Sequence, residues 1–422
     1  MNTAPPGLSS RSGFPWALLA GAGLLLFSRN PQTFLHPQLW AEDGRVWLEE
    51  AYNYGAASLF WPRAGYLQTF SRLVALAGLV FPFTALPRFF VVVSFLVQLL
   101  PAGLLLSARA RALMPWAPAR MILVFYYIVE PNSSELFVNL TNAMWHLALA
   151  GLLIVVLEKP QSMLMRMTDM AVLALSGLSG PLGLYIAPIA WWETLRQKGS
   201  GYKIALTYAV VTSCCAMVQI ACLMTHKDQR IGHLGASFGR FVHIIADQIV
   251  LGSLLGARIT MLICQMPFWR TVLPASMVCL AAGCLLMAAL RYGTHPYRML
   301  VLFSALLLVS ALARPLVTLE NQWEAMQYPG AGDRYYVIPM LALFAGATML
   351  AGNAAARDGK RGWRFFLLLT PFIIGIGADW RLPDKPSTGY QAVAARFDAA
   401  PPGFIADFPE APSPWHFILT KK

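Results

Sequence analysis

Two adjacent carboxylates, Glu42 and Asp43, stand between Trp40 and Trp47, directly after the first apolar segment of the chain. Charged side chains make up only 12% of the residues, so a pair of acids in this position is unusual for the sequence. Neighbouring acids and water-excluding rings raise a carboxyl pKa, and a general base needs a pKa tuned by its surroundings. The pair therefore predicts a site of proton abstraction. The alternative is a solvated acidic turn in which Asp43 caps the following helix.

A second group of polar residues has helical spacing. Glu135, Asn139, Asn142 and His146 follow one another at intervals of four, three and four residues. On one helix they would share a face, and a polar face in an apolar helix must point into the bundle or into a wet cavity. The alternatives are hydrogen bonds between helices for the two asparagines and a satisfied core position for His146.

The composition indicates a multi-pass helical membrane protein. Hydrophobic residues make up 57% of the 422 residues, and the mean hydropathy is +0.55. The apolar runs have helical length and lack the two-residue alternation of a barrel. The net charge of +12 fits Lys and Arg in cytoplasmic loops and requires no nucleic acid. The six cysteines form no metal-binding pattern, so we expect small core residues.

We expect an all-α integral membrane bundle of about eleven transmembrane helices. The predicted spans are 14–29, 84–107, 120–131, 142–157, 168–178, 181–196, 203–224, 271–291, 298–314, 335–352 and 364–378. Residues 1–378 would form this bundle, with outer loops at 30–83 and 225–270, and residues 379–422 a short periplasmic tail or cap. Within the outer loops, 67–81 and 238–250 have the polar and apolar faces of interfacial helices.

Basic and acidic residues segregate under this arrangement. If the N-terminus is cytoplasmic, one set of Lys and Arg residues falls inside, as the positive-inside rule requires. These residues are Arg11, Arg109, Arg111, Arg120, Lys159, Arg166, Arg196, Lys198, Lys203, Arg291, Arg298, Arg357, Lys360, Arg361 and Arg364. The acids Glu42, Asp43, Glu49, Glu50, Glu130, Glu135, Glu320, Glu324 and Asp333 then fall outside. The C-terminus is outside as well.

A smaller set of basic residues interrupts this pattern on the outer side. The set comprises Arg63, Arg72, Arg314, Arg334, Lys227 and Arg230. An arginine near an interface suits a phosphate because its planar fork pairs with two oxygens. Arg334 is the first candidate because Tyr335 and Tyr336 follow it, with Arg72 second and Arg314 third. The alternatives are lipid-headgroup contacts and simple ion pairs, such as Asp333 with Arg334.

Two stretches resemble a known superfamily. The first is Ala41-Glu-Asp-Gly44 with Tyr52, Gly55, Ser58-Leu59, Pro62-Arg-Ala-Gly-Tyr-Leu67 and Arg72-Leu73. The second is Asn139-Leu-Thr-Asn-Ala-Met-Trp145. Together they resemble bacterial membrane glycosyltransferases of the GT-C superfamily over about residues 40–147, and the remainder resembles them in layout only. The resemblance implies a polyprenyl-phosphate sugar donor and an acidic general base in the first outer loop. By motif position that role falls on Asp43, with Glu42 as competitor.

The expected function is therefore sugar transfer to an acceptor hydroxyl at the periplasmic face of a bacterial inner membrane. Arg334, Arg72 and Arg314 would bind the donor phosphate. Glu135, Asn139, Asn142, His146, Tyr66 and Tyr335 would line the substrate cavity. No cofactor is required, although a divalent metal is compatible with two acids. Acceptors of three kinds fit: a surface protein such as pilin, lipopolysaccharide or another envelope glycan. The alternative is a polytopic lipid or polysaccharide transporter or flippase.

Overall fold

The computed structural model describes residues 14–225, 232–318, 320–358 and 366–422. Six of the basic residues discussed above lie outside the described residues: Arg11, Lys227, Arg230, Lys360, Arg361 and Arg364.

The chain is mainly helical, and its elements follow one another in three groups. The first comprises α1 (Trp16–Arg29), α2 (Gln32–Leu35), the π-helical turn η1 (Asp43–Leu48), α3 (Glu49–Tyr54), η2 (Gly55–Phe60), α4 (Thr69–Gly78) and η3 (Phe83–Ala85). The second comprises α5 (Leu86–Leu106), η4 (Ala108–Ala112), α6 (Ala117–Val129), η5 (Ser134–Leu136), α7 (Ala143–Val156), α8 (Met163–Leu178), α9 (Gly183–Arg196) and α10 (Ser200–Thr225).

The third group begins with α11 (Phe238–His243), η6 (Ile244–Leu251), α12 (Gly252–Cys264), η7 (Pro267–Arg270), α13 (Val272–Tyr292) and α14 (His295–Ala313). It continues with α15 (Gln322–Met326), η8 (Asp333–Tyr335), α16 (Val337–Asp358), α17 (Thr370–Ala378) and α18 (Tyr390–Ala399). It ends with the antiparallel hairpin of β1 (Ile405–Pro409) and β2 (His416–Thr420), in which Phe408 pairs with Phe417.

The helices fit a multi-pass membrane protein, but eleven spans are not confirmed. Among the described residues, six helical segments are long and apolar enough to cross a membrane. They are Phe83–Leu106, Ser200–Thr225, Phe238–Cys264, Val272–Tyr292, His295–Ala313 and Val337–Asp358. Four further apolar helices, Trp16–Arg29, Ala117–Val129, Ala143–Val156 and Phe366–Ala378, are shorter than the roughly 20 residues of a straight span. Helices α8 and α9, at 16 and 14 residues, are short as well.

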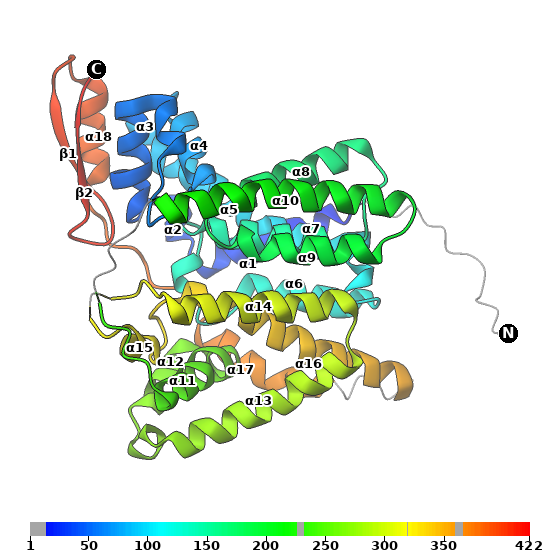
Figure 1. Ribbon diagram of the computed structural model, residues 1–422. Helices are drawn as coiled ribbons and strands as arrows, with labels where there is room; N and C mark the ends of the chain where they lie inside the picture. The colour runs from blue at the N-terminus through cyan, green and yellow to red at the C-terminus, as the bar shows by residue number, and fades with distance from the viewer. Residues whose placement is uncertain (1–13, 226–231, 319, 359–365) are drawn as a thin grey trace.

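The segment expected as an outer loop at 225–270 differs from the expectation. Its described part contains a helical run, Phe238–Cys264, that is itself long and apolar enough to cross a membrane. The run is interrupted at Gly256, whose φ of 75° lies outside the conformations of a right-handed helix. Gly256 lies within α12, and both α11 and α12 lie at the same end of the bundle as the C-terminal hairpin (Figure 1).

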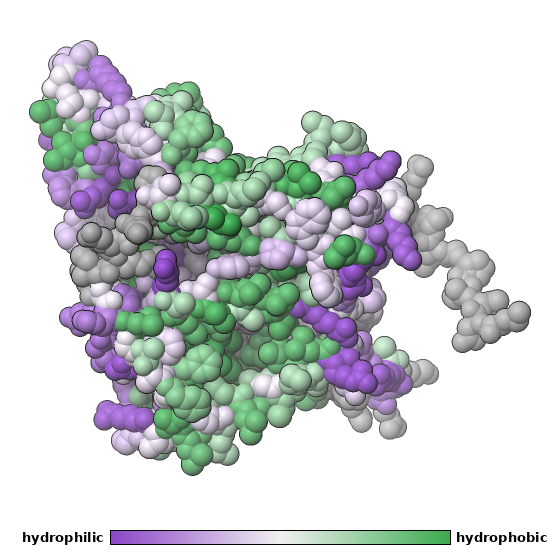
Figure 2. Space-filling view, in the orientation of Figure 1, coloured by the Kyte–Doolittle hydropathy of each residue, from purple (hydrophilic) through white to green (hydrophobic). Residues whose placement is uncertain are grey.

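The long helices run side by side between two ends of the molecule. Helices α3, α4 and α18 and the hairpin gather at one end, where α10 and α14 finish, and the α9–α10 connection lies at the other (Figure 1). Hydrophilic residues concentrate towards both ends, and the surface between them is largely hydrophobic (Figure 2). This distribution is the one that a bilayer imposes on a helical bundle.

Helix α7 is the centre of the main core, since every residue from Ala143 to Val156 is buried. A second apolar cluster lies at the hairpin end. It joins η1, α4 and the start of α5 to the cap, which we define as residues 379–422, through side chains such as Trp47, Phe83, Phe397 and Phe408. The end of the chain is therefore packed onto the segment that carries the two acids.

Reporter fusions test the topology. Fusions after residues 115, 200 and 358 should read cytoplasmic, because these positions lie at the end opposite the cap and carry the Lys and Arg residues. A fusion after residue 400 should read periplasmic. A cytoplasmic signal at residue 400 contradicts this topology.

Candidate functional site

The acids lie on a short segment, residues 40–45, which we call the acid loop. It begins with Trp40 in a parallel bridge to Ala411 of the cap. Ala41 has a positive φ of 49°, a conformation that is uncommon for a residue other than glycine. Asp43 then opens the π-helical turn η1. Wide turns of this kind are rare and occur frequently at functional sites.

Asp43 faces inward and is only 2% exposed. One of its oxygens, Oδ1, accepts hydrogen bonds from the backbone N–H (3.0 Å) and the hydroxyl (2.7 Å) of Thr141, in the turn that leads into α7. The other, Oδ2, accepts from the backbone N–H of Trp40 (3.2 Å). Burial raises the pKa of Asp43 to about 6, and these hydrogen bonds and Lys385 oppose the rise. Asp43 therefore fastens the acid loop to the central helix.

The cap holds the same loop from the other side. The Glu410 carboxylate is 2% exposed and accepts the backbone N–H groups of Gly44 (2.9 Å) and Arg45 (3.0 Å). A Cβ atom at Gly44 would overlap Glu410 and the Phe417 ring, so glycine is required for this approach. Burial and the neighbouring Asp43 raise the pKa of Glu410 to about 8.

Glu42 has a different environment from Asp43. It is partly exposed and lines a cavity of about 720 Å³, which we call the acid cavity. Asp43 is not among the residues that line it. In the part of the chain that the structure describes, the Glu42 carboxylate has no hydrogen bond or ion pair. Of the two adjacent acids, Glu42 is the one whose carboxylate can reach a bound molecule.

The acid cavity is mainly apolar and lies between helices. Nineteen of its twenty-nine lining residues are apolar or aromatic. They include Leu182 and Tyr185 near the start of α9, Leu223 near the end of α10, and Leu307 and Ala311 near the end of α14. Trp415 and Pro412 contribute a wall from the cap. The cavity thus joins an apolar floor between the helices to a charged wall at the helix ends.

Three arginines line the acid cavity: Arg63, Arg314 and Arg334. Arg334 forms an ion pair with Glu135, which lines the same cavity, and its guanidinium lies 4.8 Å from the centre of the Tyr335 ring. The Tyr335 hydroxyl accepts hydrogen bonds from Arg334 (3.3 Å) and from the backbone N–H of Leu316 (3.0 Å). These contacts hold the Arg334 side chain against the wall of the acid cavity. With Glu42 and Glu135, the three arginines give the lining a formal charge of +1.

Arg72, the second candidate for the donor phosphate, lies elsewhere. It is 1% exposed, forms an ion pair with Glu50, and its guanidinium lies 5.1 Å from the centre of the Trp47 ring. It lines none of the three cavities described here. Its contacts hold α4 against η1 and α3.

The polar stripe does not lie on one helix, so that expectation is wrong. Glu135 belongs to η5, Val138 has a φ of 40°, and α7 begins only at Ala143. The asparagines organise this turn instead. The side-chain amides of Asn139 and Asn142 both donate to the Glu135 carbonyl, at 2.7 and 2.8 Å, and the Asn139 carbonyl oxygen accepts from the Asn142 N–H at 2.8 Å.

The members of the stripe therefore have different surroundings. Glu135 and Asn142 line the acid cavity together with Tyr66 and Tyr335. Asn139 lines a neighbouring cavity of about 690 Å³, the connecting cavity. His146 is buried between the Tyr127 hydroxyl (2.9 Å) and the Leu136 carbonyl (3.2 Å), and it lines none of the three cavities.

Uncommon backbone conformations gather around these cavities. Outside glycine, positive φ values among the described residues occur at Ala41, Ala64, Asn132 and Val138. Ala41 and Ala64 line the acid cavity, and Val138 directly precedes Asn139. Such conformations cost on the order of 1–3 kcal/mol each and cluster at functional sites. Three of the four positions therefore lie in or next to the linings of the acid and connecting cavities.

Sequence reasoning missed the contributions of the cap and of Thr141. Thr141 stands inside the stretch that carries the resemblance, but nothing in the sequence connects it to Asp43. The cap segment that carries Glu410, Pro412 and Trp415 is rich in proline and aromatic residues. This composition is the only feature of the sequence that distinguishes these three residues. Because contacts across several hundred residues leave no local pattern, Glu410 could not be assigned to Gly44.

Comparison of the chain with protein-family models, curated proteins and solved structures finds no match. Among the described residues, no group of three or more His, Cys, Asp or Glu side chains is arranged to hold a metal ion. The chemistry of the site therefore has to be inferred from its geometry.

The two buried acids predict a pH-dependent stability. The folded protein raises the pKa of Glu410 from 4.5 to about 8 and that of Asp43 from 3.8 to about 6. At a pH between the unfolded and the folded pKa of either group, the unfolded chain binds fewer protons than the folded chain. The free energy of unfolding therefore falls as the pH rises. We expect the thermal unfolding temperature to decrease from pH 5 to pH 8, and this decrease to be smaller in Glu410→Gln, which cannot ionise.

Glu158→Gln is the matched control, because the Glu158 side chain is exposed and its carboxylate forms no hydrogen bond or ion pair among the described residues. This variant should retain the wild-type pH dependence. An undiminished pH dependence in Glu410→Gln would show that Glu410 does not titrate as assigned.

Proposed function

We propose that this protein is a membrane glycosyltransferase that moves a sugar from a polyprenyl-phosphate donor to an acceptor hydroxyl at the cap end of the bundle. The observation that carries the proposal is the acid cavity. It brings a carboxylate without a partner among the described residues, Glu42, together with three arginines above an apolar floor between α9, α10 and α14. The resemblance of residues 40–147 to the GT-C superfamily supports the same reading.

The apolar floor suits the lipid part of the donor. A polyprenyl chain has to remain in an apolar environment while its phosphate reaches the interface. Leu223 and Leu307 belong to α10 and α14, two helices that fit a bilayer. A chain lying between these helices would present its phosphate to Arg314 and Arg334 at the helix ends.

Glu42 is proposed as the general base and Asp43 as a positioning residue. Glu42 would take the proton of the acceptor hydroxyl while that oxygen forms a bond to the anomeric carbon. The bond from the anomeric carbon to the phosphate oxygen breaks at the same time, and its electron pair leaves with the polyprenyl phosphate. This single displacement inverts the anomeric centre. Asp43, held by Thr141, would set the direction in which Glu42 points.

Arg334, Arg314 and Arg63 would neutralise the leaving phosphate, whose charge increases by one unit in the reaction. Fixed cations that face a developing charge are an effective means of lowering a barrier. Arg72 has no part in this proposal because it is buried and lines none of the three cavities. The donor carries a single phosphate, so a divalent metal is compatible with the reaction but not required.

The proposed location is the bacterial inner membrane with the cap in the periplasm, as the positive-inside rule implies for the chain. Comparing the masses of surface glycans and surface proteins from cells with and without the gene tests the function and identifies the acceptor. Loss of a sugar increment is the expected result. Unchanged masses together with altered movement of a lipid-linked glycan across the membrane would favour a transporter or flippase instead.

Single substitutions separate the roles of the two acids. Glu42→Gln should reduce transfer by about 10²–10⁴-fold, the usual contribution of a general base. It should leave the unfolding temperature near that of the wild type, because the Glu42 carboxylate has no partner among the described residues. Transfer is measured as the sugar increment on the acceptor, and unfolding on the purified protein.

Asp43→Asn should lower the unfolding temperature, because an amide cannot accept every hydrogen bond from Trp40 and Thr141. If Asp43→Asn abolished transfer at wild-type stability while Glu42→Gln remained active, the base would be Asp43. Full activity in both variants would remove the acid loop from the chemistry.

Polyprenyl phosphate, the leaving group itself, tests the cation site without knowledge of the sugar. Arg334→Ala should weaken its binding by about ten- to a hundredfold, the effect of losing a charge-assisted contact. Arg334→Lys should retain part of the affinity because it keeps the charge but not the fork. Binding can be measured by ligand-induced thermal shift in detergent.

Arg240→Ala is the control for this measurement. Arg240 also forms an ion pair, with Glu324 at 2.9 Å, and lines none of the three cavities. Equal affinities in Arg334→Ala and Arg240→Ala would contradict the assignment of Arg334.

A further inference from the structure

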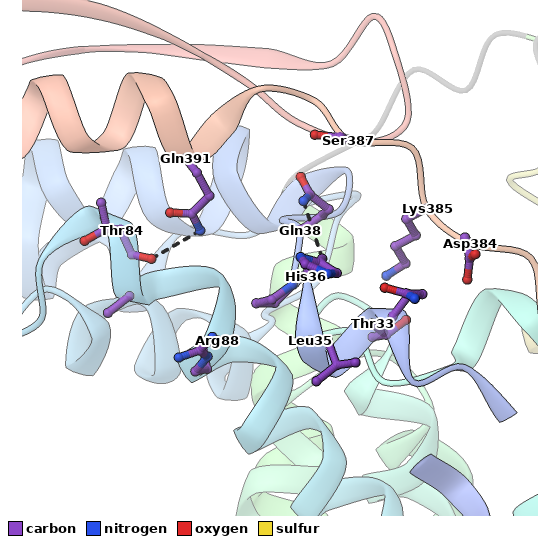
Figure 3. A pocket seen from close by; sticks show the side chains of 13 residues that line it. Thr33, Leu35, His36, Gln38, Thr84, Arg88, Asp384, Lys385, Ser387 and Gln391 are labelled. Carbon is purple, nitrogen blue, oxygen red and sulfur yellow. Dashed lines mark hydrogen bonds between the residues drawn. The ribbon is translucent and has the colours of Figure 1, made fainter. Parts of the chain in front are cut away.

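A third cavity lies beside the acid loop and takes no part in the donor site described above. Its volume is about 610 Å³, and we call it the strap cavity because residues 384–391 pass over it like a strap. The segment from α2 to Gln38 and the start of α5 form its other walls (Figure 3). The Thr388 hydroxyl donates to the Gln38 side chain (3.0 Å) and the Gln391 amide to the Thr84 carbonyl (3.3 Å), so the strap is tied to both walls.

The linings of the two cavities differ in polarity. Ten of the thirteen residues around the strap cavity are polar or charged, and the apolar ones are Leu35, Pro37 and Ala85. In the acid cavity, by contrast, nineteen of twenty-nine are apolar or aromatic. A lining of amides, hydroxyls and an imidazole without a large apolar surface suits a hydroxyl-rich molecule. It does not suit a lipid chain.

The strap cavity also carries two cations, Arg88 and Lys385, and one acid, Asp384. In Figure 3 the two cations lie on either side of His36 and Gln38. The Arg88 side chain is exposed and has no hydrogen bond or ion pair in the part of the chain that the structure describes. The nearby acid Asp398 already accepts from the N–H groups of Phe83 (2.9 Å) and Thr84 (3.1 Å). The strap cavity thus presents the planar guanidinium of Arg88 to an anionic ligand.

Lys385 connects the strap cavity to the acid loop. Its ammonium lies 4.8 Å from the centre of the Trp40 ring, and its pKa is lowered to about 8 by burial, an effect that Asp43 opposes. Lys385, Asp384 and Thr33 also line the connecting cavity. That cavity in turn shares Trp40, Glu135 and Arg334 with the acid cavity. The three cavities therefore adjoin in a row, with Trp40 and Pro412 beside Glu42.

We propose that the strap cavity binds an acidic glycan, meaning a sugar chain that carries a carboxylate or phosphate group. Amide and hydroxyl groups hold the sugar hydroxyls, and Arg88 with Lys385 holds the anionic group. The row of cavities leads a sugar hydroxyl from this site towards Glu42. Its role as acceptor site rests on the proposed function, whereas the binding of an acidic glycan does not.

The test is a binding measurement on the full-length protein in nanodiscs of zwitterionic lipid. The probes are trigalacturonate, which is acidic, and maltotriose, a neutral trisaccharide of equal length. Trigalacturonate should bind at least about tenfold more tightly than maltotriose, and Arg88→Ala should remove most of this difference. Lys385→Gln should weaken trigalacturonate binding in the same direction. Arg240→Ala, on the same end of the molecule but outside the cavities, should retain the wild-type affinity.

Three results would overturn the proposal. They are equal affinity for the two probes, unchanged trigalacturonate affinity in Arg88→Ala, and displacement of trigalacturonate when phosphatidylglycerol replaces part of the zwitterionic lipid. The last result would identify an anionic headgroup site instead.

Polyprenyl phosphate binding, measured on the same preparation, separates this proposal from the proposed function. Trigalacturonate binding without polyprenyl phosphate binding would contradict the donor site and leave the glycan site standing. The reverse result would contradict the glycan site alone.

Discussion

Two buried carboxylates, Asp43 and Glu410, hold the acid loop from opposite sides, and the geometry of the site depends on them. Burying a carboxyl group costs free energy unless hydrogen bonds replace its lost hydration. Here all four oxygens accept hydrogen bonds, mostly from backbone N–H groups of the loop and of Thr141. Because Thr141 lies in the turn that leads into the fully buried helix α7, the loop takes its position from the core of the bundle.

The same anchoring explains how two adjacent acids acquire different environments. Successive residues on a helical turn point in directions about 100° apart. Once Thr141 holds Asp43 inward, Glu42 has to point elsewhere, and it faces the acid cavity. The cap contributes Pro412 and Trp415 to the wall of the acid cavity, so the cap forms part of the candidate site. In the proposed mechanism Glu42, whose carboxylate has no hydrogen bond or ion pair among the described residues, takes the proton of the acceptor.

The membrane character, the helical class and the segment that carries the acids could be predicted from the sequence, because hydropathy and local spacing determine these features. The sequence did not reveal the lengths of the shorter helices, which is why eleven spans were expected, whereas six helices among the described residues are long enough to cross a membrane. The polar stripe was misassigned because Val138 leaves the helical region, and helical spacing cannot reveal a turn stabilised by Asn139 and Asn142. The contact between Glu410 and Gly44 spans 366 positions and has no local signature.

The two acids that line the acid cavity are not equivalent, because Glu135 forms an ion pair and Glu42 forms none among the described residues. Glu135 is paired with Arg334, and that pair is fixed on the wall by Tyr335. In the proposed mechanism an acid paired as Glu135 is would be a weaker base than Glu42, because a neighbouring arginine stabilises the ionised form of a carboxyl group. With three arginines and two acids, the lining keeps a formal charge of +1, which the proposed mechanism uses to hold the donor phosphate. The ion pair between Arg334 and Glu135 thus leaves Glu42 without a partner among the described residues, while the cavity as a whole stays cationic.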